Sequence, residues 1–141
     1  MRLNPHVNFN GNCEAAFKFY EQRLGGKISF IMTYGASPMA KDTPSEFSGK
    51  IMHATLQLGE STMTGNDIAP GYPYHPPQGC SVTIETKDPA EAERAFVALA
   101  EQGKVEMPLQ ETFWAVKFGV VTDRFGVPWM VNCGKAAQQS A

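Results

Sequence analysis

His53 is the first candidate for chemistry in this chain, because it lies among alternating side chains in a predicted strand over residues 50–58. It shares one face of that strand with Ile51, Thr55 and Gln57, and the other face is apolar: Met52, Ala54, Leu56 and Leu58. If the apolar face meets the helices, the mixed face looks into a cleft, where an imidazole can form hydrogen bonds or move a proton. The alternative is a solvent-facing or structurally satisfied histidine, since the sequence shows no carboxylate partner for it. His53 and Thr55 are therefore predicted pocket residues.

Aromatic side chains gather in the second half of the chain, at Phe113, Trp114, Phe118 and Trp129. Aromatic surface with a few polar groups is suited to line a ligand pocket, and it is also what an ordinary core uses. We predict that Trp129 and Phe118 belong to the core and that Trp114 lines the pocket.

The cysteines Cys13, Cys80 and Cys133 are odd in number and lack C-x-x-C spacing, which argues against a disulfide framework and a zinc knuckle. Three reduced thiols are predicted. Cys80 could act as a nucleophile only with a nearby base, and inert packing is the alternative. Lys117 shares parity with Gly119, so it either faces water or offers a positive charge to an anionic ligand.

Two helices must position these strands. Behind Asn12, a good N-cap, apolar residues recur at helical spacing, which predicts a helix over residues 13–24 ended by Gly25. Asp88 and Pro89 mark the start of a second helix over residues 89–101. The two apolar stripes match position by position: Cys13, Ala16, Phe17, Tyr20 and Leu24 in the first, and Ala92, Ala95, Phe96 and Leu99 in the second. The chain therefore contains a weak internal repeat, and both stripes are predicted to be buried.

Each predicted helix has one strand before it and three after it. The strands cover residues 5–10, 27–33, 50–58 and 61–65 in the first half, and 80–86, 104–107, 113–121 and 127–133 in the second. A turn at residues 123–126 joins the last two strands, because glycine admits positive φ and aspartate can bond its own backbone. Strands in hairpins with one helix per unit indicate an α+β fold of two βαβββ units forming a curved sheet around a cleft.

One domain over residues 1–141 is expected, with unit 1 at 3–66, a linker at 67–79 and unit 2 at 80–134. The linker carries four prolines around Tyr72, Tyr74 and His75, which favours extended backbone. It is either a lid over the cleft or a solvent-exposed connector. A second loop, over residues 34–49, is of the length that is often functional.

Composition excludes several classes of partner. The chain is 43% apolar and 18% charged, enough to build a core, and 12 basic against 14 acidic residues give a net charge of −2. The basic residues are scattered, so no nucleic acid partner is expected. No segment approaches the roughly 20 apolar residues that span a bilayer, and the N-terminus lacks the apolar core of a signal peptide. A cytoplasmic protein without a membrane partner is predicted.

The paired units, with Phe9-Asn-Gly-Asn-Cys-Glu-Ala-Ala-Phe-Lys-Phe-Tyr20 leading to two glycines, resemble the vicinal oxygen chelate superfamily of glyoxalase I, bleomycin and other antibiotic-resistance proteins, and extradiol dioxygenases. Lys50-Ile-Met-His-Ala-Thr-Leu-Gln-Leu-Gly59 and the segment 111–132 are similar to the branch named after phosphonate-operon protein B, also labelled demethylubiquinone methyltransferase-like. The resemblance implies a glyoxalase-like fold and a homodimer, often formed by exchanged units. Methyl transfer is not expected, because no glycine-rich turn follows a strand and opens a helix.

The resemblance also implies where a metal would bind. Superfamily members commonly hold a divalent metal with His and Glu side chains from four strands, and the metal polarises vicinal oxygens of the substrate. Those positions fall here at Pro5, Thr64 or Gly65, Cys80 and Met130. Only Cys80 is a competent ligand, and reading His6 in place of Pro5 would turn that strand to its other face. No metal cofactor is therefore expected, and Cys80 and Met130 join the predicted pocket.

These observations favour a protein that binds an unknown small molecule in an aromatic cleft without a metal. One alternative is a metal-dependent lyase, isomerase or dioxygenase of the glyoxalase type, which elemental analysis would separate from the first. The other is a dimeric interaction module with a vestigial cleft, which would show no ligand-dependent shift in melting temperature.

Overall fold

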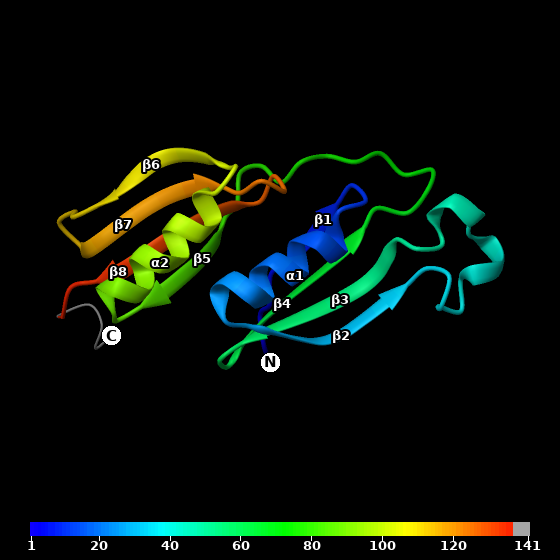
Figure 1. Ribbon diagram of the computed structural model, residues 1–141, viewed down its shortest axis with the longest axis horizontal. Helices are drawn as coiled ribbons and strands as arrows, with labels where there is room; N and C mark the ends of the chain where they lie inside the picture. Colours follow the sequence, from blue (N-terminus) through cyan, green and yellow to red (C-terminus); the bar gives the residue numbers. More distant parts are fainter. Residues whose placement is uncertain (137–141) are drawn as a thin grey trace. The chain divides into compact units, whose positions relative to one another are not determined.

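The computed structural model describes residues 1–136 and divides into two compact units, Met1–Pro76 (unit 1) and the chain from Pro77 onward (unit 2) (Figure 1). Each unit contains one α-helix and one four-stranded sheet. The α+β fold class of two βαβββ units is thereby confirmed. In each unit the helix packs on one face of the sheet, and the opposite face is called the open face below.

Unit 1 has the strand order β1-β4-β3-β2. Its elements are β1 (His6–Phe9), α1 (Cys13–Leu24), β2 (Lys27–Thr33), β3 (Ile51–Leu58) and β4 (Ser61–Asp67). β1 runs parallel to β4, and the other neighbours are antiparallel. The helix carries the chain from β1 to the far edge strand, and β3 and β4 then return toward β1.

Unit 2 repeats this plan with the order β5-β8-β7-β6. Its elements are β5 (Val82–Thr86), α2 (Pro89–Ala100), β6 (Lys104–Gln110), β7 (Ala115–Thr122) and β8 (Pro128–Gly134). β5 is parallel to β8, and the hairpin of β7 and β8 is antiparallel. The predicted helices and strands are all present, with boundaries that differ by a few residues.

The two helices begin differently. Asp88 accepts a hydrogen bond from the Ala90 N–H at 3.0 Å, as an N-cap should. Asn12 occupies the N-cap position of α1, as predicted, but its side chain makes no such bond. The carboxylate of Asp67 takes that place and accepts the Cys13 N–H at 3.0 Å. An aspartate 54 positions away in sequence thus accepts an N–H group of the first turn of α1.

Both helices bury the predicted apolar stripes. Their buried members are Cys13, Ala16, Phe17 and Tyr20 in α1, and Ala92, Ala95, Phe96 and Leu99 in α2. Leu24 is the exception, since it is only half-buried. A Cβ on Gly65 would lie 2.8 Å from the ring of Phe17, and a Cβ on Gly119 would lie 2.6 Å from the ring of Phe96. Each helix therefore approaches its sheet at a point where only glycine leaves room.

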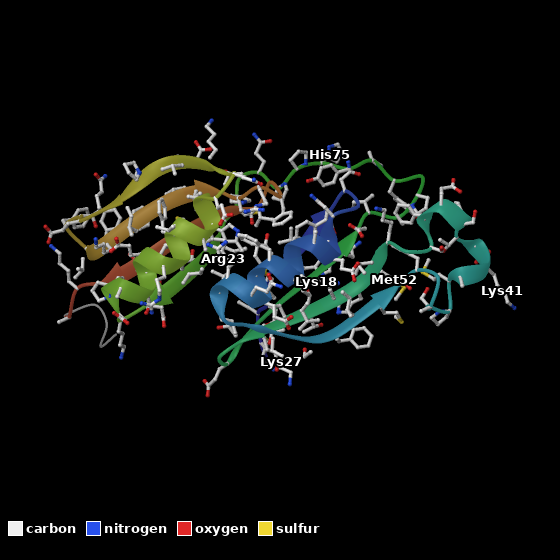
Figure 2. All side chains as sticks on the ribbon, in the orientation of Figure 1. Lys18, Arg23, Lys27, Lys41, Met52 and His75 are labelled. Atoms are coloured by element: carbon white, nitrogen blue, oxygen red, sulfur yellow. The ribbon has the colours of Figure 1, made fainter. Side chains whose placement is uncertain are left out.

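A bulge in β3 changes which side chains reach the core. The register between β2 and β3 shifts near Met52, which is the extra residue. Ile51 is 1% exposed, whereas Met52, labelled in Figure 2, is half-buried. Strict alternation predicted the reverse for these two residues. His53 and Thr55, beyond the bulge, keep the predicted face.

Asp67 is a buried carboxylate that ties three segments of unit 1 together. Its Oδ1 accepts the N–H groups of Gly11 and Cys13 at 2.9 and 3.0 Å, and its Oδ2 accepts the Ile51 N–H at 2.8 Å. The hydroxyl of Tyr34 donates to its backbone carbonyl at 2.7 Å. Burial of Tyr34 raises the pKa of its phenol. The turn after β1, the start of α1 and the start of β3 are all fixed by this one residue.

Asp123 is the buried carboxylate of unit 2, and it organises the predicted turn between β7 and β8. Its Oδ1 accepts the N–H groups of Phe125 and Val127 at 2.9 and 3.0 Å. Its Oδ2 accepts the indole N–H of Trp129 at 2.8 Å. Gly126 has a φ of 88°, as the turn prediction requires.

Two irregular segments complete unit 1. The loop after β2 contains two short 3-10 turns, η1 (Ala40–Asp42) and η2 (Ser45–Phe47), and its ends are joined by a hydrogen bond from the Gly35 N–H to the Ser48 carbonyl at 2.8 Å. In the proline-rich linker Tyr72 and His75, the latter labelled in Figure 2, are exposed. Tyr74 is half-buried, and burial raises the pKa of its phenol.

Candidate functional site

The open face of unit 1 is polar. One row of side chains crosses its four strands, because His6, Thr64, Thr55 and Phe30 are successive Cα partners. His53 lies beside this row, with its ring centroid 6.2 Å from that of His6 and 5.9 Å from that of Phe30. The face therefore brings two imidazoles and two hydroxyl groups next to one aromatic ring.

The two imidazoles differ in what they can still bind. His6 Nδ1 lies 2.7 Å from Thr64 Oγ1, and His6 Nε2 lies 2.7 Å from Asn66 Oδ1. Since Asn66 Nδ2 donates to the Asp67 carbonyl at 2.9 Å, its Oδ1 must accept, and His6 Nε2 carries the hydrogen. Among the described residues His53 has a single hydrogen bond, between its Nε2 and Thr55 Oγ1 at 3.3 Å. Within residues 1–136 the Nδ1 of His53 has no hydrogen-bond partner, so His53 is the imidazole that can meet a ligand.

The pairing of β1 corrects the sequence prediction for this edge of the sheet. His6 is the Cα partner of Thr64, whereas Gly65 lies against Phe17 on the helix side. Partners in register share a face, so His6 and Thr64 are the open-face pair, and the assignment of Pro5 to this position is wrong. β1 has only four residues, too few for alternation to reveal which of them turn away from the helix.

The open face of unit 2 is apolar and aromatic. The ring of Trp114 lies 5.1 Å from that of Phe118 and 4.7 Å from that of Phe113, both edge to face. The indole N–H of Trp114 donates to Asn132 Oδ1 at 3.2 Å. Because an indole can only donate, Asn132 presents its carbonyl to Trp114. Among residues 1–136 the Nδ2 of Asn132 has no hydrogen-bond partner, so it is a donor available to a ligand.

Two aromatic residues, Trp129 and Phe118, were predicted to lie in the core, and one of them does. Trp129 is 3% exposed, which confirms it as a core residue. Phe118 is half-buried and is the Cα partner of Asn132 on the open face, so its assignment to the core is wrong. The helix side of β7 is taken by its neighbours, the buried Gly119 and Val121. Strand alternation then leaves Phe118 on the side of Trp114.

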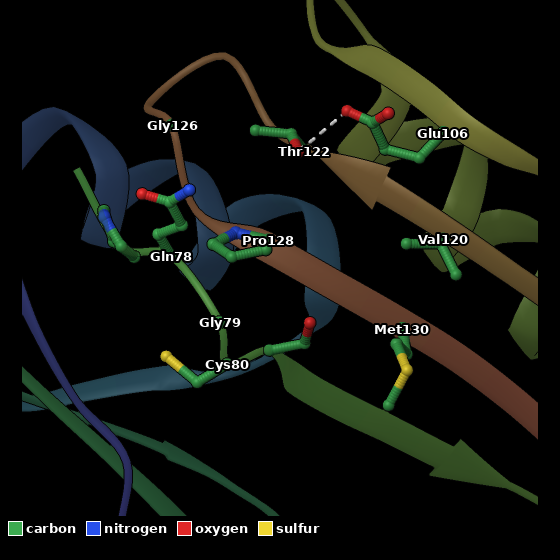
Figure 3. Close-up of a pocket in the computed structure, with 11 residues that line it drawn as sticks. Gln78, Gly79, Cys80, Glu106, Val120, Thr122, Gly126, Pro128 and Met130 are labelled. Atoms are coloured by element: carbon green, nitrogen blue, oxygen red, sulfur yellow. Dashed lines mark hydrogen bonds between the residues drawn. The ribbon is translucent and has the colours of Figure 1, made fainter.

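A hollow of about 520 Å³ opens in unit 2 between the chain before β5 and the strands β6, β7 and β8 (Figure 3). Its apolar lining includes Pro77, Val120, Pro128 and Met130, and its polar lining includes Gln78, Cys80, Ser81, Glu106 and Thr122. The hydroxyl of Thr122 donates to Glu106 Oε1 at 3.4 Å. Small-molecule sites typically enclose roughly 300–1,000 Å³, with mostly apolar walls and a few polar groups.

The predicted pocket residues fall into two groups. Cys80 and Met130 both line the hollow, and Trp114 lies on the same open face beside Phe118. His53 and Thr55 belong to unit 1. Lys117 turns to the helix side, where its Nζ lies 3.7 Å from Glu93, so it does not offer its charge to a ligand on the open face.

Cys80 differs from its predicted setting. It is exposed and precedes β5, and Thr83 is the Cα partner of Met130 on that strand. Thr83, and not Cys80, is therefore in register with Met130, so the assignment of Cys80 to the metal position is wrong. Because Cys80 is exposed, it is not an inert packed thiol either. Cys13 is buried, and this burial, with the charge of Asp67, raises the pKa of its thiol.

The side chains at the superfamily metal positions do not fit a divalent cation. The open-face pairs at the parallel strands are His6 with Thr64 and Thr83 with Met130. Only His6 is a good ligand, and both of its ring nitrogens are already hydrogen-bonded. A thioether suits zinc, magnesium and manganese poorly. In the described part of the chain no three His, Cys, Asp or Glu side chains lie where they could hold a metal.

Sequence reasoning missed Asn132 and Glu106, and it weighed His6 but rejected it in favour of Pro5. Asn132 follows Met130 at the two-residue spacing of a strand and could have been found by alternation. Glu106 could not, because the register between β6 and β7 shifts between Val105 and Met107 and makes it a bulge residue.

Comparison with known proteins identifies the family. A family model described as 3-demethylubiquinone-9 3-methyltransferase matches residues 1–132. The chain belongs to this family. It is 36% identical over 144 residues to Protein YjdN of Escherichia coli (strain K12), an alignment that covers 96% of this chain and 97% of that protein. The crystal structure of protein PA1353 from Pseudomonas aeruginosa is 48% identical, with a TM-score of 0.88 over 95% of this chain and 98% of that one. The predicted branch is thus confirmed.

A more distant similarity places the fold. The fosfomycin resistance protein FosX from Listeria monocytogenes matches with a TM-score of 0.66 and 7% identity, over 100% of this chain and 98% of that one. At this identity the match shows the fold alone, and that fold is the glyoxalase-like one of the vicinal oxygen chelate superfamily. In residues 1–136 no helix has the length and apolar character needed to cross a membrane.

Proposed function

We propose that this member of the family binds a small molecule on the open face of unit 2, without a metal. The observation that carries the proposal is the hollow beside Val120 and Met130, which continues along β7 into the aromatic pair Phe118 and Trp114. Alternate residues of β7 share one face, so these walls form a single apolar surface. Asn132 adds a hydrogen-bond donor to it.

We propose in addition that the open face of unit 1, considered by itself, can make polar contacts to a small molecule through His53 and Thr55. His53 Nδ1 is without a hydrogen-bond partner in residues 1–136, and Thr55 holds its other nitrogen at 3.3 Å. A hydroxyl that fixes one ring nitrogen orients the other toward a ligand.

The two tryptophans make a direct test of the binding surface. Trp114 lies on the open face, and Trp129 is in the core, so a bound ligand should change only the emission of Trp114. The experiment screens small molecules by melting-temperature shift and then titrates the hits by fluorescence in the Trp114→Phe and Trp129→Phe variants. The response should vanish in the first and persist in the second. A hit that stabilises the protein while the Trp114→Phe variant keeps the full fluorescence response would place the site elsewhere.

Binding, and not methyl transfer, is the activity we propose despite the family's description. The turn from β1 to α1 contains one glycine, Gly11, and the N–H groups of Gly11 and Cys13 are already bonded to Asp67. The helix N-terminus that would receive an anionic cofactor group is thus occupied by a carboxylate of the chain itself. A metal-free site is also proposed, because the donor set does not suit a cation. Stoichiometric zinc, nickel or iron that survives dialysis against a chelator would contradict it.

We propose a homodimer in the cytoplasm as the working state. Several apolar side chains are exposed on the edge strands, including Phe30 on β2 and Val105 on β6. A second copy of the chain commonly covers exposed edge strands of this kind. The three cysteines are free thiols, which suits a reducing compartment. Sedimentation at micromolar concentration should give twice the chain mass of 15.4 kDa, and a monomer would rule the dimer out.

A further inference from the structure

We infer that the ligand of unit 2 is an elongated organic amine, with a protonated nitrogen at the Glu106 end of the open face and an aromatic ring at the Trp114 end. This inference rests on the proposed binding function and names the chemical class of its ligand. It follows from the charge of the hollow, the position of Glu106 and the length of the apolar surface.

The charge of the hollow selects against anions. Of the eleven residues that line it, all within the described chain, Glu106 is the only charged one. Lys117, the one basic residue of β7, points to the helix side and pairs with Glu93. Among the residues that line the hollow, a carboxylate or phosphate ligand would therefore meet a carboxylate and no cation. An ammonium group would meet a complementary charge.

Glu106 is turned toward the hollow by an irregularity of its strand. Val105 and Met107 are the partners of Val121 and Val120, so Glu106 is the extra residue of a β-bulge. Bulges commonly re-aim a side chain next to a functional site. The Thr122 hydroxyl holds one oxygen of Glu106 at 3.4 Å, and Lys104 Nζ lies 3.8 Å from the other. The Lys104 side chain is 77% exposed, so an ammonium group of a ligand can replace it.

The apolar surface sets the length of the ligand. Thr122, Val120 and Phe118 follow one another at alternate positions of β7, and the ring of Trp114 lies beyond Phe118. Four residues of strand at about 3.3 Å each separate Thr122 from Phe118, which gives about 13 Å. The middle of the ligand lies over Val120 and Met130, and its ring lies against two aromatic side chains. A ring substituent that accepts a hydrogen bond would meet Asn132 Nδ2.

The experiment uses phenylalkylamines with two, four and six methylene groups, together with the six-methylene alcohol and 6-phenylhexanoate. Affinities are measured by calorimetry on the full-length protein. Affinity should rise with chain length, and the longest amine should bind at least tenfold more tightly than 6-phenylhexanoate. In Glu106→Gln the amine should fall to the affinity of the alcohol, and in Lys104→Met it should bind several-fold more tightly. Melting curves check that both variants are folded, and Thr122→Val serves as a second, milder variant.

Two outcomes separate this inference from the function on which it rests. If the alcohol binds and the amine has no advantage, or if Glu106→Gln leaves the advantage unchanged, the amine assignment is wrong and small-molecule binding stands. If none of the compounds binds at millimolar concentration, and no hit of the melting-temperature screen responds through Trp114, the open face of unit 2 is not a binding site. Equal affinity for all three amines would overturn the elongated shape.

Discussion

In unit 1 the ring of Phe17 rests on Gly65, and in unit 2 the ring of Phe96 rests on Gly119. Each unit also has one aspartate that is less than 5% exposed and accepts three N–H groups. On the helix side, therefore, both units have a glycine beneath an aromatic ring and a buried aspartate, although these residues lie at different places in each unit. These shared features belong to the fold, because they hold a helix against a sheet in both units.

The open faces have diverged. That of unit 1 carries two histidines and a row of hydroxyl and amide groups, and His6 there is tied by Thr64 and Asn66. That of unit 2 carries Trp114 and Phe118 beside a hollow with a single carboxylate. Residues under the helix are constrained by packing, whereas residues on the open face are free to vary with the ligand. The open face of unit 2 is therefore suited to apolar contacts, and that of unit 1 to directed polar contacts.

The buried aspartates give the largest predicted effects. Asp67 joins three separate segments, whereas the carboxylate of Asp123 accepts from residues two, four and six positions later. Asp67→Ala should lower the free energy of unfolding by about 3–5 kcal/mol, and Asp123→Ala by about 2–3 kcal/mol, since each leaves two buried donors and one part-buried donor without their acceptor. Urea unfolding followed by circular dichroism measures both. A larger loss for Asp123→Ala would show that the local turn, not the long-range tie, limits stability.

The glycines beneath the helices should give the next largest effects. A methyl group on Gly119 would lie 2.6 Å from Phe96 and 3.1 Å from the backbone of Leu109, and one on Gly65 would lie 2.8 Å from Phe17. Each Gly→Ala change should destabilise by about 1–3 kcal/mol through overpacking, more at Gly119. The double variant Gly119→Ala with Phe96→Leu should regain part of the loss in thermal unfolding. Additive losses in that double variant would mean that the ring is not the obstacle.

Substitutions on the two open faces should weaken ligand binding by different amounts. With any hit of the melting-temperature screen, Trp114→Ala should weaken binding about tenfold, which is about 1.4 kcal/mol. His53→Ala should weaken about threefold the binding of a ligand on the open face of unit 1, because it removes one polar contact and little core. Calorimetry on both variants measures the ratio, and Thr55→Val tests the hydroxyl that holds His53. A greater loss at His53 would reverse the assignment and make unit 1 the main binding surface.

Thiol chemistry should give the smallest effect on stability and a clear difference between the units. Cys80 of unit 2 is exposed, whereas Cys13 of unit 1 and Cys133 are buried. One thiol per native chain should react with a disulfide reagent, and three should react in denaturant. Burial raises the pKa of the Cys13 thiol, which also lowers its reactivity. Cys80→Ser should abolish the native reaction and change stability by less than about 0.5 kcal/mol. A native reaction at Cys13 would reveal opening of α1.

The helices, the hairpin turn and the α+β class could all be predicted from the sequence. These features depend on neighbours in the chain: the spacing of Phe17 and Tyr20, the cap at Asp88 and the glycine at Gly126. Local patterns of this kind are visible because their period or their turn chemistry spans only a few residues. The aromatic residues in and just before β7 led to the prediction of a pocket at Trp114, which stays a prediction, and Phe118 was assigned to the wrong side.

The three-dimensional structure decided which residues face one another, because register and bulges come from pairing between distant strands. A bulge at Met52 places Ile51, and not Met52, in the core. A second bulge turns the side chain of Glu106 toward the hollow. The parallel pairing of β1 with β4 places His6, and not Pro5, opposite Thr64. The carboxylate of Asp67, and not the side chain of Asn12, accepts an N–H group at the start of α1, across 54 positions of sequence. None of these contacts leaves a periodic signal in the chain, since a shift of one residue in register reverses every side chain without changing the sequence pattern. The sequence by itself determined the elements and their order, and only tertiary pairing determined which side chains share each open face.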